Sequence, residues 1–228
     1  MALFAPIPKA SRTLRVLARL LSYPDPEMRA NLDEMAAVVG GEAALGAARQ
    51  AELQELMESI ARRPPLEVEA EYVELFDRGR STSLHLFEHV HGDSRERGPA
   101  MVDLLRTYES AGLHLAPGEL PDYLPVVLEF ASTQPPREAR ALLVEFVHLL
   151  NALFAALQRQ RSAYASVIAA LIELAGEKAE AVAVVADEAI DASWAEPPVF
   201  GGCSVLGQTR PEQPQPIHFV RRTPVAGG

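Results

Sequence analysis

Residues 121–160 read PDYLPVVLEFASTQPPREARALLVEFVHLLNALFAALQRQ, and this stretch decides the fold class. Its first part, 121–133, is apolar nearly all round, which is typical of a buried helix that begins at Pro121. Pro135 and Pro136 separate it from a second apolar segment, which predicts a long helix over 137–160. Polar residues interrupt that segment before about 18–20 apolar residues accumulate, so it favours a core helix over a membrane span.

Helical periodicity extends outward from this stretch in both directions. Pro24 ends the first helix, Asp25 is a plausible N-cap, and Pro26 then stands at the first helical position. Residues 66–77 alternate as a strand would, but their many glutamates favour helix. The apolar spacing, with Gly and Pro as stops, predicts helices over about 14–21, 26–40, 42–63, 66–77, 84–90, 94–111, 121–133, 137–160, 164–175 and 177–193.

The predicted fold class is all-α: a single helical domain of nine to ten helices over residues 1–194. From 195 to 228, Pro and Gly crowd the sequence, which predicts an irregular C-terminal tail. Residues 217–220 (IHFV) are the apolar exception in this tail, and we expect that they can dock onto the core or onto a partner.

Composition narrows the class of function. The chain has 228 residues, 48% of them hydrophobic, and a formal net charge of −10. An acidic chain argues against a nucleic-acid backbone binder, whose surface would be basic. The single cysteine, Cys203, excludes an internal disulfide and a Cys-rich metal site. Arginines interrupt the first apolar segment, so no secretory signal forms, and we expect a cytoplasmic protein with no membrane insertion.

The sharpest enzyme-like pattern is His85-Leu86-Phe87-Glu88-His89, which matches H-x-x-E-H. On a helix, His85 and His89 would share one face and could bind Zn²⁺ while Glu88 activates a water. This predicts a zinc-dependent hydrolase as an alternative function. The competing interpretation is a partly exposed helix whose imidazoles bond to nearby backbone or carboxylates. The short motif and the lack of a sheet to hold substrate favour that interpretation.

Two segments, 89–101 and 119–125, carry more His, Asp, Gly and Pro than the helices around them. In the first, Gly92 permits a turn, and Asp93 or Ser94 then caps the next helix. In the second, Asp122 near the start of a helix is favoured by the helix dipole. The alternative is that this second segment is a rigid acidic helix start that lines a groove.

Several stretches together resemble the respiratory nitrate reductase assembly chaperones, the NarJ family, within the molybdoenzyme chaperones that include TorD and DmsD. The resemblance covers most of residues 14–200. It is carried by residues 20–24 (LLSYP), 72–98 (YVELFDRGRSTSLHLFEHVHGDSRERG), 119–125 (ELPDYLP) with 128–130 (LEF), and 194–199 (WAEPPV). Residues 119–125 are similar to an E-x-D-H-type signature, with Leu-Pro and Tyr123 where relatives often have Pro and His.

The resemblance implies an all-helical private chaperone with no catalytic residues, metal or cofactor of its own. Its partner would be the apo catalytic (alpha) subunit of a membrane-bound nitrate reductase, bound chiefly at its N-terminal segment until the molybdenum cofactor is inserted. A related molybdoenzyme is an alternative client. The polar segments 80–93 and 119–129 are where we expect the client groove. Its predicted residues are Leu86, Phe87, His89, His91, Asp93, Glu119, Asp122, Tyr123, Val126 and Glu129.

Overall fold

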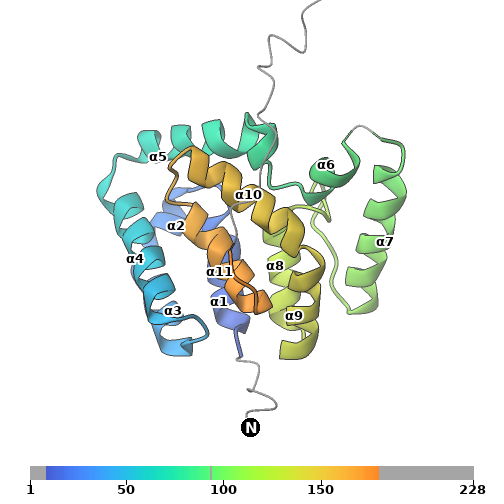
Figure 1. The fold of residues 1–228 in the computed structure, drawn as a ribbon, viewed down its shortest axis with the longest axis horizontal. Helices are drawn as coiled ribbons and strands as arrows, with labels where there is room; N and C mark the ends of the chain where they lie inside the picture. The colour runs from blue at the N-terminus through green and yellow to red at the C-terminus, as the bar shows by residue number, and fades with distance from the viewer. Residues whose placement is uncertain (1–8, 93, 180–228) are drawn as a thin grey trace, which may run out of the picture. The chain divides into compact units, whose positions relative to one another are not determined.

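Eleven α-helices make up most of the part of the chain that the structure describes, residues 9–92 and 94–179 (Figure 1). The structure is a computed structural model. Within the described residues there is no β-strand, which confirms the all-α class. The helices are α1 (Ser11–Leu20), α2 (Pro26–Ala30), α3 (Leu32–Glu42), α4 (Ala47–Arg62), α5 (Pro65–Tyr72), α6 (Leu86–His91), α7 (Arg97–Ser110), α8 (Leu124–Thr133), α9 (Pro136–Glu145), α10 (Val147–Arg159) and α11 (Ala165–Ala175).

Helix α1 lies at the centre of the helical bundle and packs against α3, α8 and α11 (Figure 1). Its predicted apolar face is buried, and Leu17 and Leu20 have no exposed surface. Each leucine that is fully buried in this way stabilises the fold by roughly 1.5–3 kcal/mol. Helices α10 and α11 pack together on the other side of the core, and α11 is buried along most of its length. The apolar helices predicted from the sequence therefore form the core.

Local helix signals are confirmed at three ends. The Asp25 side chain accepts a hydrogen bond of 2.7 Å from the Met28 backbone N–H, and Pro26 is the first residue of α2. Helix α4 ends directly before Arg63 and the two prolines. Gly176 follows α11 with φ of +85°, the left-handed conformation that glycine adopts without strain.

Two predicted helices are broken, and one boundary moves. The helix predicted over 26–40 divides at Asn31, and its second part, α3, continues through both glycines to Glu42. The carboxylate of Glu42 accepts hydrogen bonds from the Arg12 and Thr13 backbone N–H groups. Because this contact holds Glu42 at the first turn of α1, the next helix starts at Ala47 and not at 42.

The long helix predicted over 137–160 is also wrong. It divides at Phe146, where φ and ψ are −95° and 1°, into α9 and α10, which are bent by 64°. With this bend, α9 and α10 both pack on α11, and α9 also packs on α8. In the part of the chain that the structure describes, no single helix is long and apolar enough to cross a membrane, although this bent pair passes by length and composition.

The prediction that Pro121 starts a helix is wrong, because α8 begins at Leu124. Residues 84–86 pair with 122–124 instead, as Leu86 N donates to the Asp122 carbonyl at 3.0 Å and Leu124 N donates to the Leu84 carbonyl at 2.8 Å. The helix predicted from 84 therefore starts at Leu86. The ambiguous stretch 66–77 is helical throughout, as α5 followed by a π-helical turn over Val73–Asp77.

Helix α7 is less buried than the core helices. Of its side chains, only Tyr108 is buried, while the apolar Met101, Leu104 and Leu105 are half-buried. Figure 1 shows α7 at the edge of the bundle, beside α6. The helix starts at Arg97, and Asp93, one of its two predicted caps, lies outside the described residues.

The predicted last helix and the tail are not described by the structure. Residues 177–179 are not helical, and the rest of the predicted helix over 177–193 lies outside the described residues. The boundary predicted at 194/195 and the tail itself also lie outside them.

Candidate binding site

The two segments in which the client groove was predicted, 80–93 and 119–129, meet in the fold. His85 and Tyr123 form an isolated antiparallel bridge, flanked by the two backbone hydrogen bonds between 84–86 and 122–124. This pairing brings the start of α6 against the start of α8. Side chains from residues 83–88 and 122–123 therefore lie together, as the grouping of polar residues predicted.

Asp122 is the buried centre of this contact. It is fully buried, and its Oδ2 atom accepts a hydrogen bond of 3.2 Å from the Phe87 backbone N–H in the first turn of α6. The same oxygen lies 3.6 Å from a guanidinium nitrogen of Arg97 at the start of α7. The sequence predicted that Asp122 stands at the start of its own helix, where the helix dipole favours a carboxylate. Its side chain instead caps α6 through the backbone N–H of Phe87, 35 residues earlier in the chain. One carboxylate thus holds α6, α7 and the start of α8 together.

His85 completes the charge arrangement. Its Nδ1 atom lies 3.5 Å from Asp122 Oδ1, and its ring packs against the Tyr123 ring with centroids 5.2 Å apart. The Asp122 carboxylate raises the pKa of His85, and Glu88 acts in the same direction. Burial and Arg97 oppose this effect and lower the pKa, but the net direction is upward.

A cavity of about 230 Å³ opens beside this cluster, and we call it the aromatic cavity. It is lined by Tyr72, Phe76, Asp77, Ser83, Leu84, His85, Glu88 and Tyr123.

The tyrosines of the aromatic cavity are held in place by hydrogen bonds. The Tyr72 hydroxyl donates to the Leu21 carbonyl at 2.8 Å and lies 3.2 Å from the Tyr123 hydroxyl. Burial raises the pKa of both phenols, so both stay neutral. Aromatic rings beside the carboxylates of Asp77 and Glu88 are the surroundings that a cationic side chain prefers.

The H-x-x-E-H residues do not form a zinc site in this fold. His85 lies before α6 with an extended backbone, so it does not share a helix face with His89. The His89 Nε2 atom bonds to the Ser83 carbonyl at 2.8 Å, while Glu88 accepts from the Ser83 hydroxyl at 2.6 Å and lies 3.4 Å from Arg97. The three side chains therefore meet three different sets of partners, and the hydrolase alternative receives no support. These contacts agree with the structural interpretation of the motif, since the His89 imidazole bonds to a backbone carbonyl and the His85 imidazole lies beside the Asp122 carboxylate.

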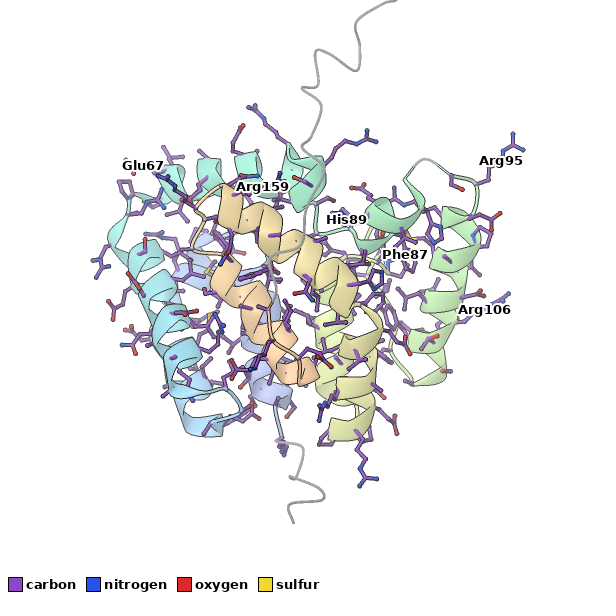
Figure 2. The ribbon with its side chains drawn as sticks, viewed as in Figure 1. Glu67, Phe87, His89, Arg95, Arg106 and Arg159 are labelled. Atoms are coloured by element: carbon purple, nitrogen blue, oxygen red, sulfur yellow. The ribbon has the colours of Figure 1, made fainter. Side chains whose placement is uncertain are left out.

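The predicted site residues divide by burial. Leu86 and Asp122 are buried, whereas Glu119 and Glu129 are exposed. The half-buried members are Phe87, His89, His91, Tyr123 and Val126. Figure 2 labels Phe87 and His89 on α6, and the Phe87 ring meets the His91 ring edge-on at 5.6 Å. Tyr123 is the one predicted residue among those that line the aromatic cavity, and Asp93 lies outside the described residues.

Sequence reasoning missed most of the aromatic cavity. Tyr72 and Phe76 fell in the ambiguous stretch 66–77, and His85 and Glu88 were considered only as parts of a zinc motif. Arg97 had no role assigned to it beyond its place in the family-like block. The usable signal was the family-like block over 72–98, which contains seven of the eight lining residues and all three residues that contact the Asp122 carboxylate, His85, Phe87 and Arg97.

Comparison with known proteins places the chain in a family. The family model described as "Nitrate reductase delta subunit" matches residues 42–172, more than half of the chain. The nitrate reductase molybdenum cofactor assembly chaperone NarJ of Escherichia coli (strain K12) is 41% identical over 193 residues, which cover 80% of this chain and 82% of that protein. The probable NarJ chaperone of Bacillus subtilis (strain 168) is 34% identical over 161 residues, 70% of this chain and 86% of that protein.

A solved structure shares the fold. It comes from Archaeoglobus fulgidus, is assigned as a redox enzyme maturation protein, and matches with a TM-score of 0.56 and 20% identity over 77% of this chain and 98% of that one. At this identity the likeness concerns the arrangement of helices alone. The sequence matches are stronger evidence, and they show that the chain belongs to the nitrate reductase delta subunit family, together with the NarJ assembly chaperones.

Proposed function

We propose that this protein is a private chaperone for the catalytic subunit of a membrane-bound nitrate reductase. It binds the apo subunit, chiefly at the N-terminal segment, and holds it until the molybdenum cofactor is inserted and docking to the membrane partners can follow. The relatives named as nitrate reductase molybdenum cofactor assembly chaperones support this proposal. The protein works in the cytoplasm and binds its client without making or breaking covalent bonds. A related molybdoenzyme is the alternative client.

The aromatic cavity is the observation that carries the binding site. Asp77 and Glu88 supply negative charge, and the rings of Tyr72 and Tyr123 supply flat apolar walls. An Arg or Lys side chain of the client enters this cavity, because partial burial between rings and carboxylates strengthens the attraction to a cation. The net charge of −10 also draws a basic client segment toward the protein before contact.

We assign the other predicted residues that the structure describes to the same client groove. Phe87 and Val126 are half-buried and offer apolar contact to the client residues that flank the cation. His89 and His91 on α6, together with the exposed Glu119 and Glu129, form a polar rim. Asp122 and Leu86 are buried, so their role is to position α6 and Tyr123 beneath the bound segment. Groove binding of this kind needs an apolar floor with polar groups at its edge.

The experiment compares two matched substitutions by calorimetric titration. The probe is a synthetic peptide with the N-terminal segment of the nitrate reductase catalytic subunit from the same organism. Asp77→Asn removes one charge from the aromatic cavity, and Asp33→Asn makes the same change on α3, away from the cavity. We expect Asp77→Asn to weaken binding by about 1 kcal/mol, a modest effect because Asp77 is exposed, and to weaken it more at low salt than at high salt.

Asp33→Asn should leave the affinity within experimental error at both salt concentrations. Equal losses for both variants would mean that the peptide senses only the net charge of the protein. No binding to the wild-type chain would contradict the proposed function itself.

A further inference from the structure

We infer that the aromatic cavity selects arginine over lysine, so that the client residue whose cation enters it is an arginine. The inference rests on the proposed function, because it names the side chain that occupies the same subsite. Three features of the cavity carry it: the aromatic rings of its floor, the position of its two carboxylates, and a lining of described residues that contains no arginine or lysine.

The floor of the cavity is aromatic. Tyr72 and Phe76 are buried, and the centroids of their rings lie 4.9 Å apart. The half-buried Tyr123, which directly precedes α8, contributes a third ring. A planar guanidinium can lie against the face of a ring, and it is more weakly hydrated than an ammonium group. An arginine therefore loses less hydration free energy than a lysine when its charged group reaches these rings.

A π-helical turn brings one carboxylate to the rings. In an α-helix, a residue five positions after another is rotated by about 140° from it around the helix axis. The turn over Val73–Asp77 closes instead with a hydrogen bond of 3.2 Å from the Arg78 backbone N–H to the Val73 carbonyl, five residues earlier. This wider turn rotates Asp77 back toward the side of Tyr72, and both residues line the cavity. The π turn thus adds a carboxylate to a wall that a regular helix would leave apolar.

The second carboxylate comes from another element and is held in place. Glu88 on α6 accepts a hydrogen bond of 2.6 Å from the Ser83 hydroxyl and lies 3.4 Å from a guanidinium nitrogen of Arg97. Asp77 and Glu88 are both exposed, so they stand at the mouth of the cavity. A guanidinium carries N–H donors around the edge of one plane, so it can donate to two carboxylates while its face meets a ring. The compact ammonium group of lysine has no flat face for such a contact.

His85 is the other group in the lining that can carry a positive charge. Its Nδ1 atom lies 3.5 Å from Oδ1 of Asp122, which does not line the cavity. Asp122 therefore offsets the charge of a protonated imidazole from outside the cavity, and the carboxylates at the mouth stay available to a ligand.

Two other hollows also contain carboxylates, but their linings differ. One, of about 430 Å³, contains Glu52 together with its ion-pair partner Arg49. The other, of about 370 Å³, contains Glu74 together with Arg78, which lies 3.0 Å from it. Each of these hollows has a single aromatic ring in its lining, whereas the aromatic cavity has three. Selection of arginine therefore depends on rings and carboxylates together, and not on negative charge alone.

The first test compares two probes on the full wild-type chain. They are N-acetyl-arginine methylamide and N-acetyl-lysine methylamide, which carry the same charge and differ in the cationic group. NMR titration follows the amide signals of residues 85–88 and 123 at the cavity, with those of α3 as the control. We expect the arginine probe to bind roughly tenfold more tightly at the cavity, because the ring contacts of a guanidinium are lost with an ammonium group. Equal affinities, or no binding of either probe at the cavity, overturn the inference.

Two matched substitutions then test the role of the rings. Tyr123→Leu removes a ring from the cavity, and Tyr23→Leu removes an exposed ring from another hollow. We expect Tyr123→Leu to lower the preference for the arginine probe to roughly threefold and Tyr23→Leu to leave it unchanged. If urea denaturation shows that Tyr123→Leu is not folded, the exposed Asp77→Asn takes its place and should weaken the arginine probe by roughly threefold. An unchanged affinity and preference in the folded cavity variant overturns the inference.

The catalytic-subunit peptide described above separates this inference from the proposed function. If the chain prefers the arginine probe but does not bind the peptide, the proposed function is contradicted and the selectivity stands. If the peptide binds equally well after all its arginines are replaced by lysine, the inference is overturned and the proposed function stands.

Discussion

The Nδ1 atom of His85 lies 3.5 Å from the Oδ1 atom of Asp122, and both atoms are closed off from solvent. Within the described residues neither atom has a hydrogen-bond partner, so the contact between them is electrostatic. The second oxygen of Asp122 meets the Phe87 N–H and Arg97. A buried carboxylate is costly unless it is paired, so the position of the loop before α8 depends on groups contributed by α6 and α7.

Removing this carboxylate should therefore destabilise the protein strongly. Asp122→Ala leaves the Phe87 N–H and the Arg97 guanidinium without their shared acceptor, and we expect a loss of about 3 kcal/mol in the free energy of unfolding. Asp122→Asn keeps an acceptor but loses the charge, and should cost about 1–2 kcal/mol. Urea denaturation measures both. Asp103→Ala, on the exposed face of α7, serves as the control, and a loss no larger than that of this control would contradict the role of Asp122.

Stability should also depend on pH through His85. Because the pKa of His85 is raised on folding, its contribution is complete below the ordinary value of about 6.5 and disappears as the pH rises above the raised value. The wild-type chain should exceed His85→Gln in unfolding free energy by more at pH 5.5 than at pH 8.5.

The control for this prediction is the same substitution in an Asp122→Asn background. Asp122 is the main cause of the raised pKa, with Glu88 adding to it and Arg97 opposing it. The pH dependence of the His85→Gln effect should therefore shrink when Asp122 is neutral. An unchanged pH dependence in this background would show that another group controls His85.

Removing the hydroxyl of Tyr108, the buried side chain of α7, should lower the free energy of unfolding. The Tyr108 hydroxyl donates to the Pro121 carbonyl at 2.8 Å, and its ring packs against Phe130 with centroids 4.7 Å apart. Tyr108→Phe leaves that buried carbonyl without its partner and should cost about 1–2 kcal/mol in denaturant unfolding. Tyr23→Phe removes an exposed hydroxyl that bonds to Glu69 and should leave the unfolding midpoint unchanged. Equal effects of the two substitutions would be inconsistent with this account.

Alanine substitutions at two glycines with positive φ should distinguish the cost of backbone strain from the cost of a steric clash. Gly118 has φ of +94° and open space around it, so Gly118→Ala should cost about 1 kcal/mol for the backbone alone. Gly176 has φ of +85°, and an added Cβ would collide with the guanidinium of Arg140, which donates to the Ala175 carbonyl at 2.8 Å. Gly176→Ala should cost at least 1 kcal/mol more than Gly118→Ala in thermal or urea unfolding. Similar losses would mean that Arg140 moves aside freely.

The sequence by itself determined the features that depend on neighbours within one or two helical turns. Leu14 and Leu17 recur on one face, so α1 and its buried side were predictable. Asp25 before Pro26 and Gly176 after α11 specified helix ends through local hydrogen bonding and backbone angles. The family-like block over residues 72–98 also marked the region of the aromatic cavity, because a long run of matching residues is specific even without a structure.

Only the tertiary structure decided which groups meet across long separations. Asp122 carried the local signal of a helix start, yet its carboxylate caps α6, 35 residues earlier, because backbone pairing of 84–86 with 122–124 places it there. Phe146 carried no Pro or Gly signal, yet α9 and α10 separate there, and the bend lets both helices pack on α11 while α9 also packs on α8. Bringing two distant segments together costs conformational entropy of the chain, and only the burial and hydrogen bonds of the assembled core offset that cost. The sequence around one of the two segments therefore does not reveal which other segment it will contact.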